Sequence, residues 1–191
     1  MSQKSNNLAH LWETPVSTEL IYDGEVVHLY KDISTLPNGE PAMREYIRHI
    51  GAICVLPMTA EGEVICVKQY RYPFADVLLE LPAGKRDTFD EDPNETVVRE
   101  LREETGAVSG KITYLGMHYP SPAILDERMY MFLAEDLTFG EVDRDEDEFI
   151  ELVRIPFDRL KEMVLAGEIP DGKTQLTVLR AAAVLEKRNA Q

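Results

Sequence analysis

The sequence predicts an α/β sandwich, in which helices cover a mixed central sheet. Strand-like segments come both before and after a well-marked helix at residues 93–105, and further helical segments follow the last strands. Apolar runs at 51–57 and 64–70 are typical of central strands that are covered on both faces. The 191 residues, 44% of them hydrophobic, suffice for one good core and a small extension.

The expected elements follow one another without a repeat or a low-complexity linker. After a polar, unpatterned start up to about residue 15, the expected strands span residues 18–23, 26–35, 42–49, 51–57, 64–70, 78–81, 111–119, 128–135 and 149–155. The expected helices span residues 93–105, 157–166 and 173–187. A turn at Ala60-Glu61-Gly62 predicts a hairpin between the two central strands.

The first three strands predict an antiparallel β extension in front of the main domain. Leu36-Pro37-Asn38-Gly39 supplies the hairpin turn between the second strand and the third. A sheet this small cannot hide its own apolar face, so Ile21, Val27 and Leu29 need a partner surface. A homodimer with exchanged N-terminal strands would provide that surface.

The helix at residues 93–105 is specified by local signals at both of its ends. Asp92 can cap the first turn, Pro93 suits the first position, and Glu95 falls where a capping box places an acid. Gly106 can close the helix. At about 100° per residue, one arc collects the residues expected to be buried, which are Val97, Val98, Leu101 and Thr105.

Glu100, Glu103 and Glu104 fall together on the neighbouring arc of this helix. Like charges three or four residues apart destabilise a helix by roughly 0.2–0.5 kcal/mol per pair, and no lysine shares the arc to neutralise them. Hard divalent cations such as Mg²⁺ take oxygen ligands and bridge carboxylates to substrate phosphates, so a metal site suits this face. On the helix alone, the alternative is a solvated acidic face without chemistry.

The composition narrows the class of protein. Twenty basic and 35 acidic residues give a net charge of −15, which argues against nucleic acid or an anionic membrane as a partner. A polyanionic substrate would therefore need a metal and local arginines. We recognise no signal peptide and no apolar stretch of membrane-spanning length. The two cysteines, Cys54 and Cys66, lie in apolar runs without metal-ligand spacing, so we expect core packing and a reducing cytoplasm.

A spaced set of residues around the helix resembles the signature of the Nudix hydrolases. The set comprises Gly84, Glu91, Arg99-Glu100-Leu101, Glu103-Glu104 and Gly106-Ala107. The family pattern has five residues between the glycine and the first glutamate, whereas Lys85 to Asp90 makes six, so this loop is one residue longer. The spacing among the helix glutamates matches the family. The resemblance implies a Nudix-type α/β/α sandwich with a mixed central sheet and an N-terminal antiparallel β extension.

Over about residues 21–185, the chain is similar to the ADP-ribose pyrophosphatases and related nucleotide-sugar pyrophosphatases of that family. The matching features are Arg44-Glu45 ahead of Gly51-Ala52, Lys68-Gln69-Tyr70-Arg71, Glu80-Leu81-Pro82-Ala83-Gly84, Ser121-Pro122 with Glu127, and Glu146-Asp147-Glu148. Pro122 follows the signature at a spacing that favours ADP-ribose over nucleoside triphosphates, although Ala123 stands where close relatives often carry glycine. The resemblance implies that residues 1–49 form a tail and strand extension for dimerisation and the nucleotide pocket, and that residues 50–191 form the Nudix hydrolase domain.

The resemblance also implies a set of metal ligands. The set consists of the carbonyl oxygen of Ala83, Glu100 and Glu104 as principal ligands, Glu103 as an assisting ligand, and Glu148. Carboxylates and a carbonyl are hard ligands that suit Mg²⁺ or Mn²⁺, and two or three ions per site are expected. Such ions would neutralise the diphosphate, orient a water for in-line attack and lower its pKa. Arg99 is expected to point away from the metals and to anchor the loop through Glu91 or a neighbour.

The general base in this family usually comes from a loop late in the chain. Residues 143–148 hold five acids in six positions, and their mutual repulsion would suit a lid that closes over the diphosphate. The resemblance favours Glu146 as the base and makes Glu148 the competing candidate, with Glu103 assisting in catalysis. A merely solvated acidic turn is the alternative for the segment.

Substrate contacts are implied at both ends of the expected ligand. Arg44 and Arg71 would contact the phosphates or the nucleoside, where a guanidinium fork gives bidentate binding. Glu127 resembles the residue that hydrogen-bonds the terminal ribose. Surface ion pairs for the two arginines, and a surface charge at a strand entry for Glu127, are the alternatives. The candidates for an aromatic side chain that stacks on the base, in some relatives from the partner subunit, are Tyr22, His28 and Tyr30.

These inferences predict a metal-dependent hydrolase that cuts ADP-ribose and water into AMP and ribose 5-phosphate. A GDP-mannose or UDP-sugar pyrophosphatase using the same machinery is the alternative within the family. From a different class comes a non-catalytic Nudix-fold sensor of ADP-ribose. Such sensors usually lose glutamates of the signature, whereas this chain retains all of them.

Overall fold

The computed structural model describes residues 6–140 and 149–190, which form two compact units. The N-terminal unit consists of residues 6–49 and Ser121–Glu127, and the second unit consists of the remaining described residues. Within these described ranges, no helix is both long and apolar enough to cross a membrane.

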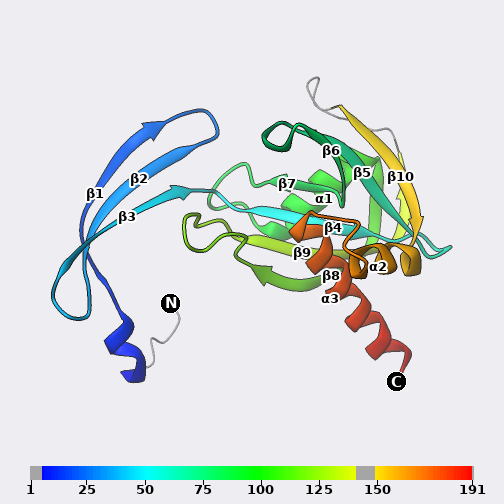
Figure 1. The fold of residues 1–191 in the computed structure, drawn as a ribbon. Helices are drawn as coiled ribbons and strands as arrows, with labels where there is room; N and C mark the ends of the chain where they lie inside the picture. Colours follow the sequence, from blue (N-terminus) through cyan, green and yellow to red (C-terminus); the bar gives the residue numbers. More distant parts are fainter. Residues whose placement is uncertain (1–5, 141–148, 191) are drawn as a thin grey trace. The chain divides into compact units, whose positions relative to one another are not determined.

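The N-terminal unit is an antiparallel sheet, drawn in blue to cyan in Figure 1. A short 3-10 helix, η1 (Asn6–Leu11), precedes the strands β1 (Thr14–Asp23), β2 (His28–Thr35) and β3 (Pro41–Arg48), which lie in that order. The predicted hairpin turn is confirmed, because the Leu36 N–H donates to the Glu40 carbonyl at 2.8 Å and Gly39 has a φ of 88°. Every residue of β1 is exposed within this chain.

The segment Ser121–Glu127 belongs to this unit because it bonds to the end of β3. The Ile47 N–H donates to the Ile124 carbonyl at 2.8 Å, and the Asp126 N–H donates to the Ile47 carbonyl at 3.2 Å. The Asp126 carboxylate also accepts the His49 N–H at 2.7 Å. Glu127 is thereby placed beside the last residues of the N-terminal sheet.

The second unit contains two sheets. The first has the order β7-β4-β9-β8 and comprises β4 (Ala52–Pro57), β7 (Ala83–Lys85), β8 (Ala107–His118) and β9 (Met129–Phe139). Within it β4 and β9 run parallel, whereas the other neighbours are antiparallel. The second sheet, β10-β5-β6, comprises β5 (Glu63–Arg71), β6 (Asp76–Glu80) and β10 (Ile150–Pro156). The predicted α/β sandwich with a mixed central sheet is confirmed.

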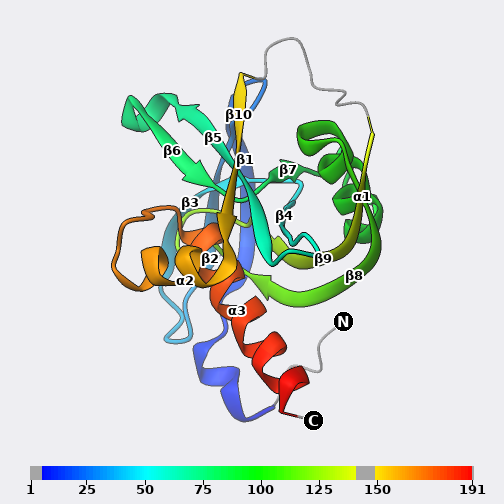
Figure 2. The same ribbon diagram turned by 90° about the vertical axis from the view of Figure 1, so that its right-hand side faces the viewer.

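Strand β4 serves two cores at once, because successive side chains point to opposite faces. Ile53 and Val55 pack with Val97 and Leu101 of α1 (Pro93–Thr105), which Figure 2 shows beside β8 and β9. Cys54 and its neighbours on the other face pack with α2 (Phe157–Leu165) and α3 (Gly172–Asn189). Every residue of β4 is buried, so the strand forms the centre of the unit.

The helix α1 has the predicted bounds, and the capping signals explain them. The Asp92 carboxylate accepts the Asn94 N–H at 2.9 Å, and Gly106 closes the helix with a φ of 69°. Of the four residues expected on the buried arc, three are buried, but Val98 is 50% exposed. Val98 lies at the edge of that arc and lines a hollow on the exposed side of α1, so its predicted burial is wrong.

The expected hairpin between the two central strands is also wrong. The turn itself forms, since the Thr59 N–H donates to the Glu63 carbonyl at 2.8 Å and Gly62 has a φ of 80°. Beyond the bridge between Met58 and Val64, however, the two strands separate into different sheets. Both edges of β4 are occupied by β7 and β9, so β5 pairs with β6 and β10 instead. The sequence reading also missed β7 and the short helix η2 (Tyr72–Phe74).

Candidate active site

A polar cleft of about 550 Å³ lies in the second unit, between β5, β7 and α1. It is lined by Ile50, Gln69, Arg71, Ala83, Gly84, Lys85, Arg86, Asp87, Arg99, Glu100, Glu103 and Glu104. The structure therefore brings together four of the five predicted metal ligands and the predicted phosphate contact Arg71. The fifth ligand, Glu148, and the favoured base, Glu146, lie outside the described residues.

Two of the helix glutamates are withdrawn from water. Glu100 is 8% exposed and Glu104 is 3% exposed, so each carboxylate needs compensating partners. One such partner comes from β7, because the Ala83 N–H donates to Oε2 of Glu104 at 3.3 Å. The carbonyl of Ala83, a predicted ligand, therefore belongs to a residue that is already bonded to a second predicted ligand.

Gly84 allows the approach of Glu100 to β7. A Cβ atom at position 84 would lie 1.9 Å from the carboxyl carbon of Glu100, so the Glu100 side chain would have to move. The absence of a side chain thus leaves a space that the Glu100 carboxylate occupies against the strand. This contact gives the glycine of the signature a specific packing role.

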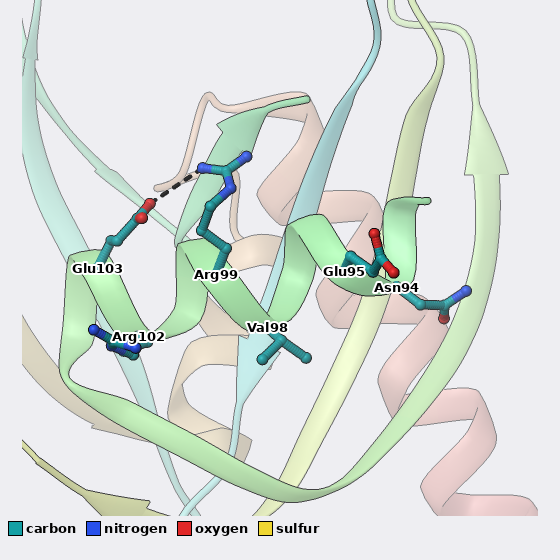
Figure 3. A pocket seen from close by; sticks show the side chains of 6 residues that line it. All are labelled: Asn94, Glu95, Val98, Arg99, Arg102 and Glu103. Atoms are coloured by element: carbon teal, nitrogen blue, oxygen red, sulfur yellow. Dashed lines mark hydrogen bonds and ion pairs between the residues drawn. The ribbon is translucent and has the colours of Figure 1, made fainter. Parts of the chain in front are cut away.

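Arg99 is a cation that four acids of α1 and the loop before it share. Its Nη1 contacts Glu100 at 2.9 Å and Glu103 at 3.1 Å, and its Nη2 contacts Asp87 and Glu91 at 3.4 Å each. Burial alone would lower the pKa of Arg99, but Glu100 and the other carboxylates raise it instead. The arginine therefore stays charged at any ordinary pH. Figure 3 shows Arg99 and Glu103 meeting on one side of α1.

The expectation for Arg99 is confirmed in one part and wrong in the other. Its Nη2 does anchor the loop before α1, through the Lys85 carbonyl at 3.0 Å and through Glu91. Its Nη1, however, does not point away from the predicted ligands but bonds to Glu100 and Glu103. The arrangement agrees with charge, because a guanidinium attracts neighbouring carboxylates.

A second ion-pair network reaches the cleft through Arg71. Arg71 binds Glu80 with both prongs of its guanidinium, Nε to Oε1 at 2.7 Å and Nη2 to Oε2 at 2.6 Å. Lys173 of α3 also donates to Oε2 of Glu80 and lies 3.1 Å from Asp171. Burial would raise the pKa of Glu80, which is 1% exposed, but Arg71 and Lys173 outweigh burial and lower it.

Within residues 6–140 and 149–190, no three His, Cys, Asp or Glu side chains stand ready to hold a metal ion. The contacts of Arg99 account for this arrangement, because a guanidinium bonds to two of the predicted ligands. The donors themselves fit Mg²⁺ or Mn²⁺, since carboxylate and carbonyl oxygens are hard ligands. The space left by Gly84 also lets the Glu100 carboxylate reach β7, which carries the Ala83 carbonyl.

The other predicted substrate contacts lie on the N-terminal unit. Arg44 donates to Glu13 at 2.6 Å, and the carboxylate of Glu127 lies 3.8 Å from the ring of His49. His28 pairs with Asp23 at 2.6 Å. Both Arg44 and His28 therefore have acidic partners within the unit, and the roles assigned to them remain predictions.

The aromatic candidates differ in how exposed their rings are and in how many contacts the rings already make. Tyr22 is 59% exposed. Tyr30 stacks on Tyr46 with ring centroids 5.8 Å apart, and the guanidinium of Arg48 lies 4.6 Å from the centre of the Tyr30 ring. One face of Tyr30 is thus engaged by a tyrosine and the ring also meets a cation, which leaves Tyr22 the more accessible ring for a base.

A shallower hollow of about 570 Å³ lies over the exposed side of α1 (Figure 3). Its lining residues are Asn94, Glu95, Val98, Arg99, Arg102 and Glu103, two of which also line the cleft. Because Arg99 and Glu103 belong to both, the hollow continues the acidic face of the helix and is not a separate site.

The sequence reading missed three residues of the site, namely Glu80, Arg86 and Lys173. Glu80 carried a signal, because an acid at the end of the apolar run 77–81 must find a cation once that strand is buried. Lys173 carried none, since 93 residues separate it from Glu80. The cysteines behave as expected: both are free and buried, and burial raises the pKa of each to about 12.

Comparisons with known proteins find relatives over most of the chain. The NUDIX domain profile matches residues 47–175. An ADP-ribose pyrophosphatase of Bacillus subtilis is 40% identical over 170 residues, which cover 88% of this chain and 91% of that protein. A methanol dehydrogenase activator of Bacillus methanolicus is 38% identical over 87% of this chain and 90% of its own length. A GDP-mannose pyrophosphatase of Pectobacterium atrosepticum is 36% identical over 71% of this chain and 74% of its own length.

A solved structure shares the fold. The crystal structure of an ADP compounds hydrolase superposes with a TM-score of 0.84, covering 93% of this chain and 97% of that one, at 20% identity. The profile match spans the cleft, α1 and the two sheets. The chain belongs to the NUDIX domain family.

Proposed function

We propose that the protein is a metal-dependent pyrophosphatase that hydrolyses ADP-ribose to AMP and ribose 5-phosphate. The observation that carries this proposal is that Glu100, Glu103 and Glu104 line one cleft together with Ala83, which gathers hard oxygen ligands in one place. These carboxylates would repel a diphosphate unless bound cations neutralised them. Nudix hydrolases generally depend on divalent metals, which supports the same conclusion.

The residues that would hold the ions are the Ala83 carbonyl, Glu100, Glu103 and Glu104, with Glu148 from the segment outside the described residues. When bound, Mg²⁺ or Mn²⁺ supplies charge neutralisation to the phosphoryl oxygens and an activated water. We expect two or three ions per site. To ligate them, Glu100 and Glu103 would exchange their bonds with Arg99 for bonds to metal.

The chain's own groups would do the remaining work. Arg71 would bind a phosphate from the cleft wall, because Glu80 takes its Nε and Nη2 and leaves the Nη1 edge out of that fork. Glu146 would remove the proton from the attacking water, with Glu148 as the competing base and Glu103 assisting. Arg44 and Glu127 would contact the substrate, and Tyr22 or His28 would stack on its base.

We further propose a homodimer with exchanged N-terminal strands. Apolar side chains are exposed on β1 and next to it, including Ile21 at 46% and Val27 at 40%. A three-stranded sheet is too small to be stable with such a face in water, so a second copy of the chain is the expected cover. The two free, buried thiols agree with a reducing cytoplasm as the location of the enzyme.

A second candidate function is hydrolysis of GDP-mannose, which the name of one relative favours. The same cleft would hydrolyse the same pyrophosphate bond. The N-terminal unit would contact the nucleobase and so distinguish one nucleotide sugar from another. Substrate choice therefore depends on residues such as Tyr22 and Glu127, whereas the chemistry depends on the glutamates of α1.

A substrate panel tests the proposal. Hydrolysis would be followed by separating the nucleotide products formed from ADP-ribose, GDP-mannose, UDP-glucose, diadenosine polyphosphates and 8-oxo-dGTP, each with Mg²⁺ or Mn²⁺. We expect the highest kcat/KM with ADP-ribose. A preference for GDP-mannose would establish the second candidate, and a preference for a triphosphate would overturn both.

A further inference from the structure

The longer loop before α1 is organised by one arginine. Arg86 donates from Nε to the Glu91 carbonyl at 2.9 Å, from Nη1 to the Ile50 carbonyl at 3.1 Å, and from Nη2 to the Phe89 carbonyl. All three nitrogens of the guanidinium therefore bind main-chain oxygens. The Arg86 side chain can hold three carbonyls at once because a guanidinium presents five N–H donors in one rigid plane.

The three carbonyls lie in two separate parts of the chain. Glu91 and Phe89 belong to the loop itself (residues 86–92), whereas Ile50 lies just before β4. The Arg86 main-chain N–H adds a bond of 3.1 Å to the Gly51 carbonyl. Residues 87–90 are exposed, and Arg86 is half-buried beneath them. The arginine thus fixes an otherwise exposed loop to the central strand.

Gly51 makes room for this arrangement. It has a φ of 94°, and a Cβ there would lie 3.4 Å from Cδ of Arg86 and 3.2 Å from the Arg128 carbonyl. A side chain at position 51 would be strained by its backbone conformation and would press on both neighbours. The glycine therefore lets the aliphatic part of Arg86 pass close to the chain.

The fixed loop in turn holds one edge of Arg99. The Nη2 of Arg99 contacts three loop or pre-loop groups: the Lys85 carbonyl at 3.0 Å, and the carboxylates of Glu91 and Asp87 at 3.4 Å each. Glu91 also accepts the Asp87 N–H, which joins the two acids. The Nη1 edge of Arg99 remains for Glu100 and Glu103.

We propose that Arg86 is a positioning residue for the metal-binding glutamates, acting through the longer loop and Arg99. By holding Asp87 and Glu91 against Nη2, it limits how strongly Arg99 can occupy Glu100 and Glu103. Without Arg86 the loop acids separate from Arg99, whose charge then falls on the two glutamates alone. A cation must compete with that charge, so metal binding weakens. The metal part of this inference rests on the proposed function, whereas the loop part does not.

The test compares Arg86→Met with wild type in two measurements on the free enzyme. Titration with Mn²⁺, followed by electron paramagnetic resonance, should show binding about tenfold weaker in the variant, the size typical when a group behind a metal ligand is removed. Hydrogen exchange in the metal-free enzyme should show faster exchange at the Asp87 and Glu91 amides. Arg159→Met, at an exposed arginine of α2, is the matched control and should match wild type in both.

A variant with a shorter loop makes the test sharper. Deleting Asp90 in the Arg86→Met background leaves five residues between Gly84 and Glu91. If the extra loop residue is what makes Arg86 necessary, this variant should bind Mn²⁺ more tightly than Arg86→Met alone. Arg86→Lys keeps the charge but not the fork, so it should also bind Mn²⁺ more weakly and serves if the methionine variant does not fold.

The outcomes separate the inference from the proposed function. Unchanged exchange at Asp87 and Glu91 would overturn the role of Arg86 in the loop. Faster exchange with wild-type Mn²⁺ binding would overturn its role in positioning the glutamates. If wild-type enzyme binds no Mn²⁺, the proposed metal dependence fails, while the exchange measurement still decides whether Arg86 holds the loop.

Discussion

Two ion-pair networks contribute residues to the cleft, and they differ in their balance of charge. In one network, Arg71 and Lys173 are paired with Glu80 and Asp171, two cations with two anions, around a carboxylate that is 1% exposed. In the other network, Arg99 alone serves four carboxylates. We refer to them below as the wall network and the helix network.

The difference indicates which network is structural and which needs a ligand. The wall network is complete within the chain and joins β5, β6 and the start of α3, so it holds the cleft in shape. In the helix network, one arginine is shared among four carboxylates. A balanced buried pair is expected to support the fold, and an unbalanced cluster is expected to bind cations.

The largest expected effect is on stability, at the wall network. Glu80→Gln would leave the half-buried Arg71 without its anion and Lys173 with Asp171 as its partner, which should reduce the free energy of unfolding by about 3–5 kcal/mol. Urea unfolding followed by circular dichroism would measure it. Glu151→Gln, at the exposed pair with Lys68, is the control and should cost less than about 1 kcal/mol. Equal losses at the two sites would remove the distinction between the buried and the exposed pair.

The next effect is on activity, at the helix network. Glu104→Gln keeps the shape of the side chain but removes a principal ligand, so kcat should fall about 100-fold or more, equivalent to about 2.7 kcal/mol. Glu95→Gln, on the exposed side of the same helix, should retain nearly full activity. Steady-state kinetics with ADP-ribose would compare the two. A loss of about threefold or less at position 104 would contradict the proposed mechanism.

Added Mg²⁺ should stabilise the protein through the helix network and not through the wall network. At a Mg²⁺ concentration ten times its Kd, the free energy of unfolding should rise by about 1.4 kcal/mol, because the ion binds the folded state. Glu100→Gln should lose most of this gain, whereas Glu151→Gln should keep it. Thermal unfolding with and without Mg²⁺ would measure the shift. Full stabilisation of Glu100→Gln would show that the ions bind elsewhere.

The smallest expected effect is a dependence on pH. The folded state lowers the pKa of Glu80 below its ordinary value of 4.5. Its contribution to stability is therefore fully present above that value and is lost as the pH falls through the lower, folded-state pKa. The stability difference between wild type and Glu80→Gln should thus narrow from neutral pH to about pH 3.5. A difference that stays constant would show that the charge of Glu80 is not what stabilises the wall.

The elements that the sequence predicted best are those specified by neighbouring residues. The bounds of α1 were predicted at both ends, because Asp92 and Gly106 act within one turn of the helix. The burial of Val98 was not, because it depends on how much of α1 the sheet covers. Likewise, the turn at residues 59–63 was predicted, while the separation of β4 from β5 depends on strands that come later in the chain.

The residues of the candidate site also divide into those that neighbouring sequence predicts and those that depend on distant parts of the chain. Glu100, Glu103 and Glu104 share a helix face, so their convergence follows from periodicity, and the structure places all three at the cleft. Lys173 reaches Glu80 from α3, a contact that no local pattern encodes. Arg86 was hidden for another reason, because a loop arginine has many possible partners and its three carbonyl bonds exist only in the folded loop.

The space beside Gly84 offers a way to separate the position of a ligand from its charge. A methyl group at position 84 would meet the end of the Glu100 side chain, which can swing aside, and not a rigid backbone atom. Gly84→Ala would therefore keep every carboxylate of the cleft while moving one of them. An enzyme altered in this way would retain its overall electrostatic attraction for cations but hold them in the wrong place. Its defect would be one of geometry and not of charge.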